Sequence, residues 1–123
     1  MFETVGIILT ILVLFQIKHW YVDFVDQTEE EVKYKGVYLD WRGMRHSIKQ
    51  GLATMLILLF FLPTEFAVFL AMIDFVIHYH TDFVKMHYGN RDIKTKAFWA
   101  QLGLDQMVHQ LSYLLIVFLI LVM

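Results

Sequence analysis

Four strongly apolar stretches, each joined to a segment rich in charge and histidine, constrain this chain more than any other feature. Each stretch is shorter than the roughly 20 apolar residues that a bilayer crossing needs. Each continues, however, into a half-polar segment whose pattern is also helical. The apolar stretches cover residues 5–15, 51–62, 66–73 and 111–123. They therefore predict four membrane-spanning helices, each apolar at one end and polar at the other, over about residues 2–25, 44–62, 65–88 and 97–123.

The overall composition agrees with a membrane protein. Of the 123 residues, 59% are apolar, against the roughly 45–50% that is usual in soluble domains. We therefore expect one integral membrane domain over residues 1–123, an all-α four-helix transmembrane bundle with a polar, His- and Asp-lined interior in its cytoplasmic half. The lack of cysteine excludes disulfides and thiolate metal sites. The net charge of -2 predicts no nucleic-acid partner. The apolar composition makes the lipid bilayer the expected partner, and homo-oligomer formation is left open.

Local signals predict where the helices end. Pro63, the only proline, is expected to separate the second and third helices, and Gly89 is expected to close the third. Thr28 and Glu31 have the spacing of a capping box. This predicts a short surface helix within the loop at about residues 26–43, with its acidic first turn in solvent.

All ten basic residues fall on one side of the predicted bundle. Lys and Arg concentrate on the cytoplasmic side of membrane helices. We therefore predict a multi-pass protein of the bacterial inner membrane, with both termini outside and the polar side, including the loop 26–43, in the cytoplasm. The ten residues are Lys18, Lys33, Lys35, Arg42, Arg45, Lys49, Lys85, Arg91, Lys94 and Lys96.

Each predicted helix carries a polar stripe that includes histidine. Residues four apart on a helix lie about 40° apart around its axis, so they share one face. Charged groups within a membrane helix cost roughly 2.5–3.5 kcal/mol each, and they normally turn to the bundle interior and pair there. The stripes contain His19 with Asp23, then His46, then Asp74 with His78, Asp82 and Lys85, and then Asp105 with His109.

Four aspartates that meet in one buried site would repel one another, because low dielectric strengthens the interaction of like charges. A divalent metal ion is the natural counter-ion. Imidazole and carboxylate ligands without sulfur suit Zn best, with Mn, Fe and Ni as alternatives, and one or two ions are left open. His109 and Asp74 are expected at matching depth near the middle of the bilayer. The predicted metal ligands are His19, Asp23, His46, Asp74, His78, Asp105 and His109.

Two further residues of the third stripe are expected to have catalytic roles. Asp82, or another aspartate that binds no metal, is the predicted general base, and Lys85 is predicted to stabilise developing negative charge. His80 and His87 lie about 240° and 220° around the helix from Asp74, so both are expected to face away from the site.

These residues form a pattern that resembles a known family. The pattern comprises His19-x-x-x-Asp23-Phe-Val-x-Gln27, Asp74-x-x-x-His78-Tyr-His-x-Asp82 and Asp105-Gln106-x-x-His109. It is similar to that of the small membrane proteins of bacteria and bacteriophages grouped as domain of unknown function 3307, over residues 17–113. A looser similarity, in size and in His and Asp on four helices, connects the chain to proteins labelled membrane-bound metal-dependent hydrolases. The second likeness implies a hydrolase, and the first family name implies no reaction.

The leading interpretation is an integral membrane metalloprotein with a site open to the cytoplasm, acting as a metal-dependent hydrolase on a lipid-linked or phosphate-bearing substrate. A metal-bound water would be the nucleophile, with its pKa lowered toward about 7. The second interpretation is a transport or conduction protein whose His and Asp residues relay protons or metal ions. The apolar outer halves of the helices argue against such a path. In the third interpretation, the buried network only sets the helix register.

Overall fold

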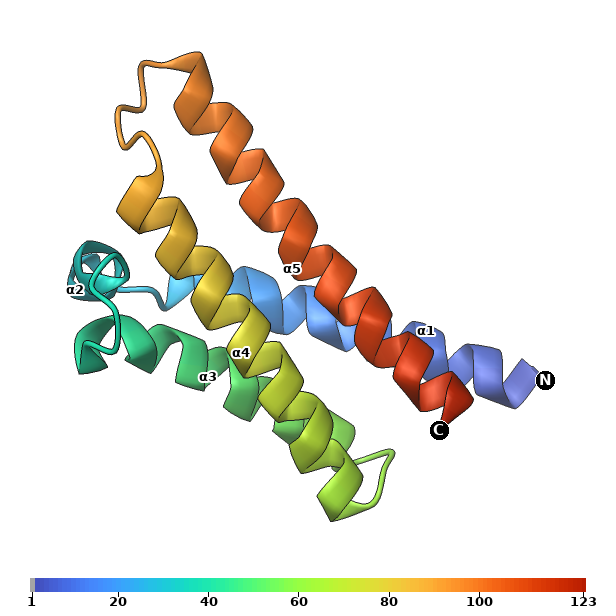
Figure 1. Ribbon diagram of the computed structural model, residues 1–123. Helices are drawn as coiled ribbons and strands as arrows, with labels where there is room; N and C mark the ends of the chain where they lie inside the picture. Colours follow the sequence, from blue (N-terminus) through green and yellow to red (C-terminus); the bar gives the residue numbers. More distant parts are fainter. Residues whose placement is uncertain (1) are drawn as a thin grey trace.

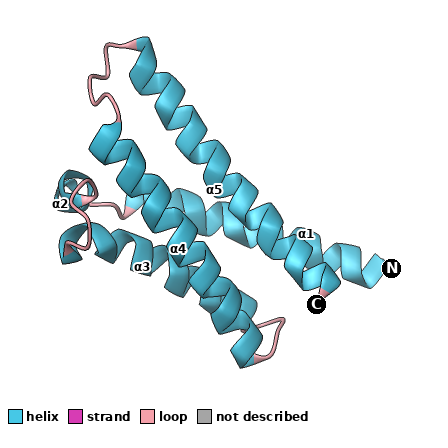
Figure 2. Ribbon diagram, viewed as in Figure 1, coloured by secondary structure: helices cyan, strands magenta, loops and turns pink. Residues whose placement is uncertain are grey.

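The computed structural model describes residues 2–123 as helices joined by loops (Figure 1). Figure 2 shows no strand over these residues, which confirms the expected all-α class. A π-helical turn directly continues the first helix, and a short helix precedes the second long one. The elements are α1 (Phe2–Trp20), η1 (Tyr21–Val25), α2 (Glu29–Tyr34), α3 (Trp41–Leu58), α4 (Thr64–Tyr88) and α5 (Lys96–Val122).

Three helical segments are long and apolar enough to cross a membrane, namely Glu3–Val25, α4 and α5. The expectation of four such helices is therefore not met within the described residues. The exception is α3, whose first half carries Arg42, Arg45 and Lys49, so that only its last turns are apolar. This helix instead packs along α4 (Figure 1).

The helix ends follow the local signals. Helix α4 begins directly after Pro63, and Gly89 caps its end by donating its N–H to the Lys85 carbonyl at 2.9 Å. The capping box is confirmed at the start of α2. Thr28 Oγ1 accepts the Glu31 N–H at 3.1 Å, and Glu31 Oε1 accepts the Thr28 N–H at 2.9 Å.

The short helix α2 packs against the start of α3. The expectation of a solvated first turn is wrong for Glu31, which is fully buried and lies 3.3 Å from Lys49 Nζ of α3. Gly43 permits this approach, because a Cβ at that position would lie 2.8 Å from the carbonyl carbon of Tyr34. The docking of α2 places the next residue, Lys35, inside the protein.

The apolar core and the polar side chains occupy opposite ends of the bundle. In Figure 1 the chain ends and the α3–α4 turn lie at one end, whereas α2 and the α4–α5 loop lie at the other. Large apolar side chains also cover the outer surface, and Phe60 is 87% exposed. An extended exposed apolar surface marks a membrane or partner contact. The core consists of Ile11, Phe15, Leu58, Ala67, Leu70, Tyr113 and Ile116.

Candidate metal centre

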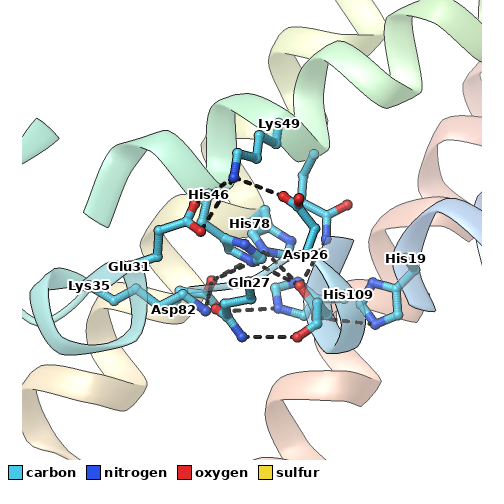
Figure 3. A network of polar contacts seen from close by, with 12 residues as sticks. His19, Asp26, Gln27, Glu31, Lys35, His46, Lys49, His78, Asp82 and His109 are labelled. Carbon is cyan, nitrogen blue, oxygen red and sulfur yellow. Dashed lines mark hydrogen bonds and ion pairs between the residues drawn. The ribbon is translucent and has the colours of Figure 1, made fainter. Parts of the chain in front are cut away.

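Five buried side chains from four helical segments converge on the α2 side of the core. Asp23 comes from η1, His46 from α3, His78 and Asp82 from α4, and His109 from α5. None is more than 9% exposed. Figure 3 shows the three imidazole rings and the Asp82 carboxylate pointing toward one another. The stripes on these four segments therefore face a common interior.

Asp23, His46 and His78 form the first group of converging donor atoms. His46 Nε2 lies 2.8 Å from Asp23 Oδ1 and 3.2 Å from His78 Nε2. His78 Nε2 lies 3.7 Å from the same Asp23 oxygen. Gln50 Nε2 also donates to this oxygen, at 2.8 Å, and so holds the carboxylate toward the two rings.

A second group shares His78 and adds Asp82 and His109. Asp82 Oδ2 lies 3.2 Å from His78 Nε2, and Asp82 Oδ1 lies 3.3 Å from His109 Nε2. The rings of His78 and His109 are stacked with their centroids 3.9 Å apart, so both present Nε2 to the same carboxylate. The two groups therefore form one continuous cluster around His78.

The separations within the cluster match those of ligands around a metal ion. A tetrahedral zinc ion with bonds of about 2.0–2.1 Å to nitrogen keeps its ligand atoms about 3.4 Å apart. The five contacts above span 2.8–3.7 Å. Moreover, Nδ1 of all three rings has no hydrogen-bond partner in residues 2–123. Every polar contact of these rings therefore points into the cluster.

The contact between His46 and His78 is the least comfortable one without a cation. Each Nε2 has a carboxylate oxygen beside it, Asp23 for His46 and Asp82 for His78. If each nitrogen donates a proton to its carboxylate, two N–H groups face each other across 3.2 Å and repel. A metal ion bound by both nitrogens removes this conflict, because each nitrogen then offers its lone pair.

Lysines neutralise three of the four aspartates in the predicted stripes. Of these four aspartates, only Asp23 has no Lys or Arg partner within residues 2–123, and its ion contacts are with histidines. The four carboxylates therefore do not require two dications for neutrality. The pairs are Lys18 Nζ with Asp74 Oδ2 at 3.0 Å, Lys35 Nζ with Asp82 Oδ2 at 3.1 Å, and Lys85 Nζ with Asp105 Oδ2 at 3.0 Å.

Asp74 lies outside the cluster, although it is a predicted ligand. Its Oδ2 accepts hydrogen bonds from Thr54 Oγ1 at 2.6 Å and from Lys18 Nζ at 3.0 Å. His109, expected beside Asp74, contacts Asp82 instead. Asp74 and Asp82 are separated by about 12 Å along the helix, so the two ends of this stripe cannot reach one ion.

His19, another predicted ligand, lies beside the cluster with both ring nitrogens occupied. Nδ1 lies 3.0 Å from the Tyr113 hydroxyl, and Nε2 lies 2.6 Å from Gln106 Oε1. Nε2 is also 3.4 Å from Asp23 Oδ2, but it belongs to neither group of converging donors. The structure therefore places His19 where it helps to hold Asp23.

Asp105 and Lys85 form the edge of the cluster. Asp105 Oδ1 lies 3.1 Å from His109 Nε2, while Asp105 Oδ2 pairs with Lys85. The Lys85 side chain is 21% exposed, so this pair connects the buried cluster with the surface. Asp82, the predicted general base, lies deeper, between His78 and His109.

His80 and His87 face away from the cluster, as the helical spacing predicts. His80 Nε2 lies 3.0 Å from the Tyr38 hydroxyl, and His87 Nδ1 donates to the Gly36 carbonyl at 2.9 Å. Neither histidine belongs to a group of converging donors, so both are suitable control positions.

Four supporting residues, Lys18, Lys35, Gln50 and Gln106, are not among the site residues predicted from sequence. Gln50 links Lys18 to the cluster, because its Oε1 accepts from Lys18 at 2.7 Å while its Nε2 donates to Asp23. A polar side chain inside a membrane helix is itself a signal of a buried partner, and this signal applies to Lys18, Gln50 and Gln106. Lys35 directly follows the short helix α2, outside the membrane-spanning helices, so the sequence gives no such signal for it.

Comparisons with protein-family models, with curated proteins and with solved structures found no match for this chain. Two groups of three buried His and Asp side chains, joined through His78, could hold a metal ion.

Proposed function

We propose that this protein is an integral membrane metalloprotein whose His and Asp cluster binds a divalent metal ion and uses it for hydrolysis. The observation that carries the proposal is the 3.2 Å contact between His46 Nε2 and His78 Nε2, with a carboxylate oxygen beside each nitrogen. Two buried N–H groups repel at this distance, whereas two nitrogen lone pairs attract a shared cation. Zn²⁺ is the first choice, because imidazole and carboxylate are among its usual ligands.

The charge balance favours a single ion per chain. The lysine pairs leave Asp23 as the aspartate without a fixed positive partner. One dication held by Asp23, His46 and His78 supplies that charge. A second dication would have to compete with Lys35 for Asp82, which the ammonium group approaches to 3.1 Å.

The hydrolytic role follows from the side chains next to this ligand set. A zinc ion with three protein ligands keeps one position for water and lowers the pKa of that water toward about 7. Asp82 would accept the proton from such a water, and Lys35 and His109 hold its carboxylate at 3.1 and 3.3 Å. Lys85, at the edge of the cluster, would offset negative charge that develops on a phosphate or ester group.

Insertion in a bacterial membrane, with the polar side in the cytoplasm, is part of the proposal. Three membrane-capable helices and a largely apolar surface support insertion. The basic residues gather toward α2 and the α4–α5 loop, which favours the cytoplasm for that end, and we propose that both chain ends lie outside. The motif resemblance to domain of unknown function 3307 and to metal-dependent hydrolases agrees with this proposal.

A protein that conducts protons or metal ions is the second candidate. The observation that favours it is a continuous series of polar contacts from Lys18 through Gln50 and Asp23 to His46. On the far side of Lys18, however, the bundle interior is filled by the buried apolar core. A path through the molecule would have to cross that core, so we favour hydrolysis.

The metal content of the detergent-purified protein tests the proposal. We expect about one zinc ion per chain by elemental analysis. His78→Ala should lose most of the metal, because it removes the residue common to both donor groups, whereas His80→Ala on the same helix should keep it. Asp82→Asn should keep the metal but lose release of phosphate from a phosphate-bearing lipid. A metal-free wild-type protein, or equal metal contents in the two histidine variants, would contradict the metal centre.

A further inference from the structure

A cleft of about 500 Å³ lies between α4 and α5, on a face that the metal ligands do not occupy. Its walls are mostly apolar and include Val84, Leu104 and Val108. Val84 and Leu104 are 53% and 56% exposed, and in Figure 1 the two helices run alongside each other from the loop that connects them. Both helices are long and apolar enough to cross a membrane, so in a bilayer this cleft opens toward lipid chains.

Positive side chains stand at the loop end of the cleft. Lys85 and Gln101 line the cleft and also line a neighbouring hollow of about 290 Å³, to which Arg91 contributes. The Arg91 guanidinium donates to the Met86 carbonyl at 2.7 and 3.1 Å and forms no ion pair within residues 2–123. Its charge is therefore available to an anionic ligand, in contrast to that of the buried lysines.

Asp105 connects this cleft with the cluster. It lines the cleft, and its two carboxylate oxygens lie 3.1 Å from His109 Nε2 and 3.0 Å from Lys85 Nζ. An anion that binds Lys85 from the cleft therefore comes to lie next to a carboxylate that touches the histidine cluster. Ligand binding and the candidate reaction would thus occur in adjacent places.

We propose that the α4–α5 cleft binds a single-chain lipid with a phosphate headgroup, which reaches the site sideways from the bilayer. The chain lies along Val84, Leu104 and Val108, and the phosphate contacts Lys85 and Arg91. A free phosphate would leave the apolar walls without a partner, and a neutral chain would leave the Arg91 guanidinium without an anionic partner. The inference rests on the proposed function for what becomes of the bound lipid, but the binding itself needs no metal.

Equilibrium binding of lysophosphatidic acid to the metal-loaded protein in detergent tests this inference. Monoacylglycerol of the same chain length lacks the phosphate, and glycerol phosphate lacks the chain. We expect each of these two to bind at least about tenfold more weakly, because each loses one class of contact. Monoacylglycerol binding as tightly as lysophosphatidic acid would overturn the headgroup contacts, and equally tight glycerol phosphate would overturn the chain contacts.

Matched variants locate the binding to the cleft. Leu104→Trp fills the cleft, whereas Leu111→Trp places the same side chain at a similarly exposed position of α5 outside it. Arg91→Gln removes a cation of the site, and Lys94→Gln removes a neighbouring loop cation that lines neither hollow. We expect Leu104→Trp and Arg91→Gln to weaken binding by about tenfold and the two controls to leave it unchanged. Equal affinities in all four variants would show that the lipid binds elsewhere.

Metal analysis of the same samples separates this inference from the proposed function. If the protein binds zinc and Leu104→Trp leaves the lipid affinity unchanged, only the cleft proposal would be rejected. If Leu104→Trp abolishes lipid binding but the protein holds no metal before or after zinc is added, only the metal centre would be rejected.

Discussion

At the scale of single residues, Asp23 and Asp74 show how two aspartates in similar sequence settings acquire different surroundings. Both lie in polar stripes of apolar helices and both are buried. Asp74 is neutralised by Lys18 and receives a hydrogen bond from Thr54. Asp23 is surrounded by histidines. The charge of Asp74 is therefore neutralised within the protein, whereas the carboxylate of Asp23 can still bind a cation.

This difference predicts opposite behaviour in two variants. Asp74→Asn should lower the free energy of unfolding by about 3–5 kcal/mol, because Lys18 is left as an unpaired buried charge, while the metal remains bound. Asp23→Asn should lose the metal, because it removes a proposed ligand. The check is thermal unfolding with and without a chelator, which lowers the melting temperature only of a protein that binds metal. A chelator effect that disappears in Asp74→Asn but persists in Asp23→Asn would exchange the roles assigned to the two aspartates.

At the scale of secondary structure, α2 shows how a short surface helix contributes to a buried site. Glu31, in its first turn, accepts from Lys49 at 3.4 Å, and Lys49 also lies 3.3 Å from its other oxygen. One turn later, Lys35 reaches Asp82. The anchoring of α2 on α3 therefore holds a lysine over the cluster.

The ionisation of Glu31 should make this anchoring depend on pH. Burial favours a higher pKa for the Glu31 carboxyl, but hydrogen bonds from the Thr28 N–H and the Lys49 ammonium outweigh it and hold the pKa below its usual value of 4.5. A group whose pKa is lowered in the folded state stabilises the fold above its unfolded-state pKa, and this stabilisation is lost as the pH falls through the folded-state pKa. Glu31→Gln should therefore lower the melting temperature at about pH 7, and the difference from wild type should shrink as the pH falls below about 4.5.

A second acid of the same turn provides the control for this prediction. Glu29 is exposed and forms no ion pair among the described residues, so Glu29→Gln should change the melting temperature little at any pH. If the melting temperature of Glu31→Gln stays below that of wild type by the same amount at neutral and acidic pH, the lost contact is not ionic.

At the scale of the whole molecule, the orientation of the bundle decides which compartment the cluster faces. The chain has no cysteine, so a single introduced thiol reports one position. Position 65 lies in the first turn of α4, directly after the α3–α4 turn, and position 94 lies in the α4–α5 loop. Both positions are exposed, so the variants to label are Glu65→Cys and Lys94→Cys. In intact cells, a membrane-impermeant thiol reagent should label position 65 and should reach position 94 only after permeabilisation, because we propose that the basic side faces the cytoplasm. The reverse labelling would place the cluster on the outer side.

Local signals were sufficient to predict the helical class and several helix ends. The turn before α4, the glycine cap after it and the capping box of Thr28 and Glu31 depend on residues that are close in sequence. Hydropathy, summed over each helix, likewise predicted Glu3–Val25, α4 and α5 as membrane-capable. The prediction that α3 crosses the membrane was not confirmed, because the apolar second half of this helix is too short and its first half is polar.

The pairing of the buried charges was decided only by the tertiary structure. Helical periodicity states which face of its own helix a side chain occupies, but it does not state how far that helix is shifted along its neighbour. The packing of α2 on α3 beside Gly43 brings Lys35 to Asp82. The packing of both α1 and α4 on α3 brings Lys18 to Asp74. These contacts join residues far apart in the chain, and they depend on the relative rotation and translation of whole helices, which side-chain packing determines.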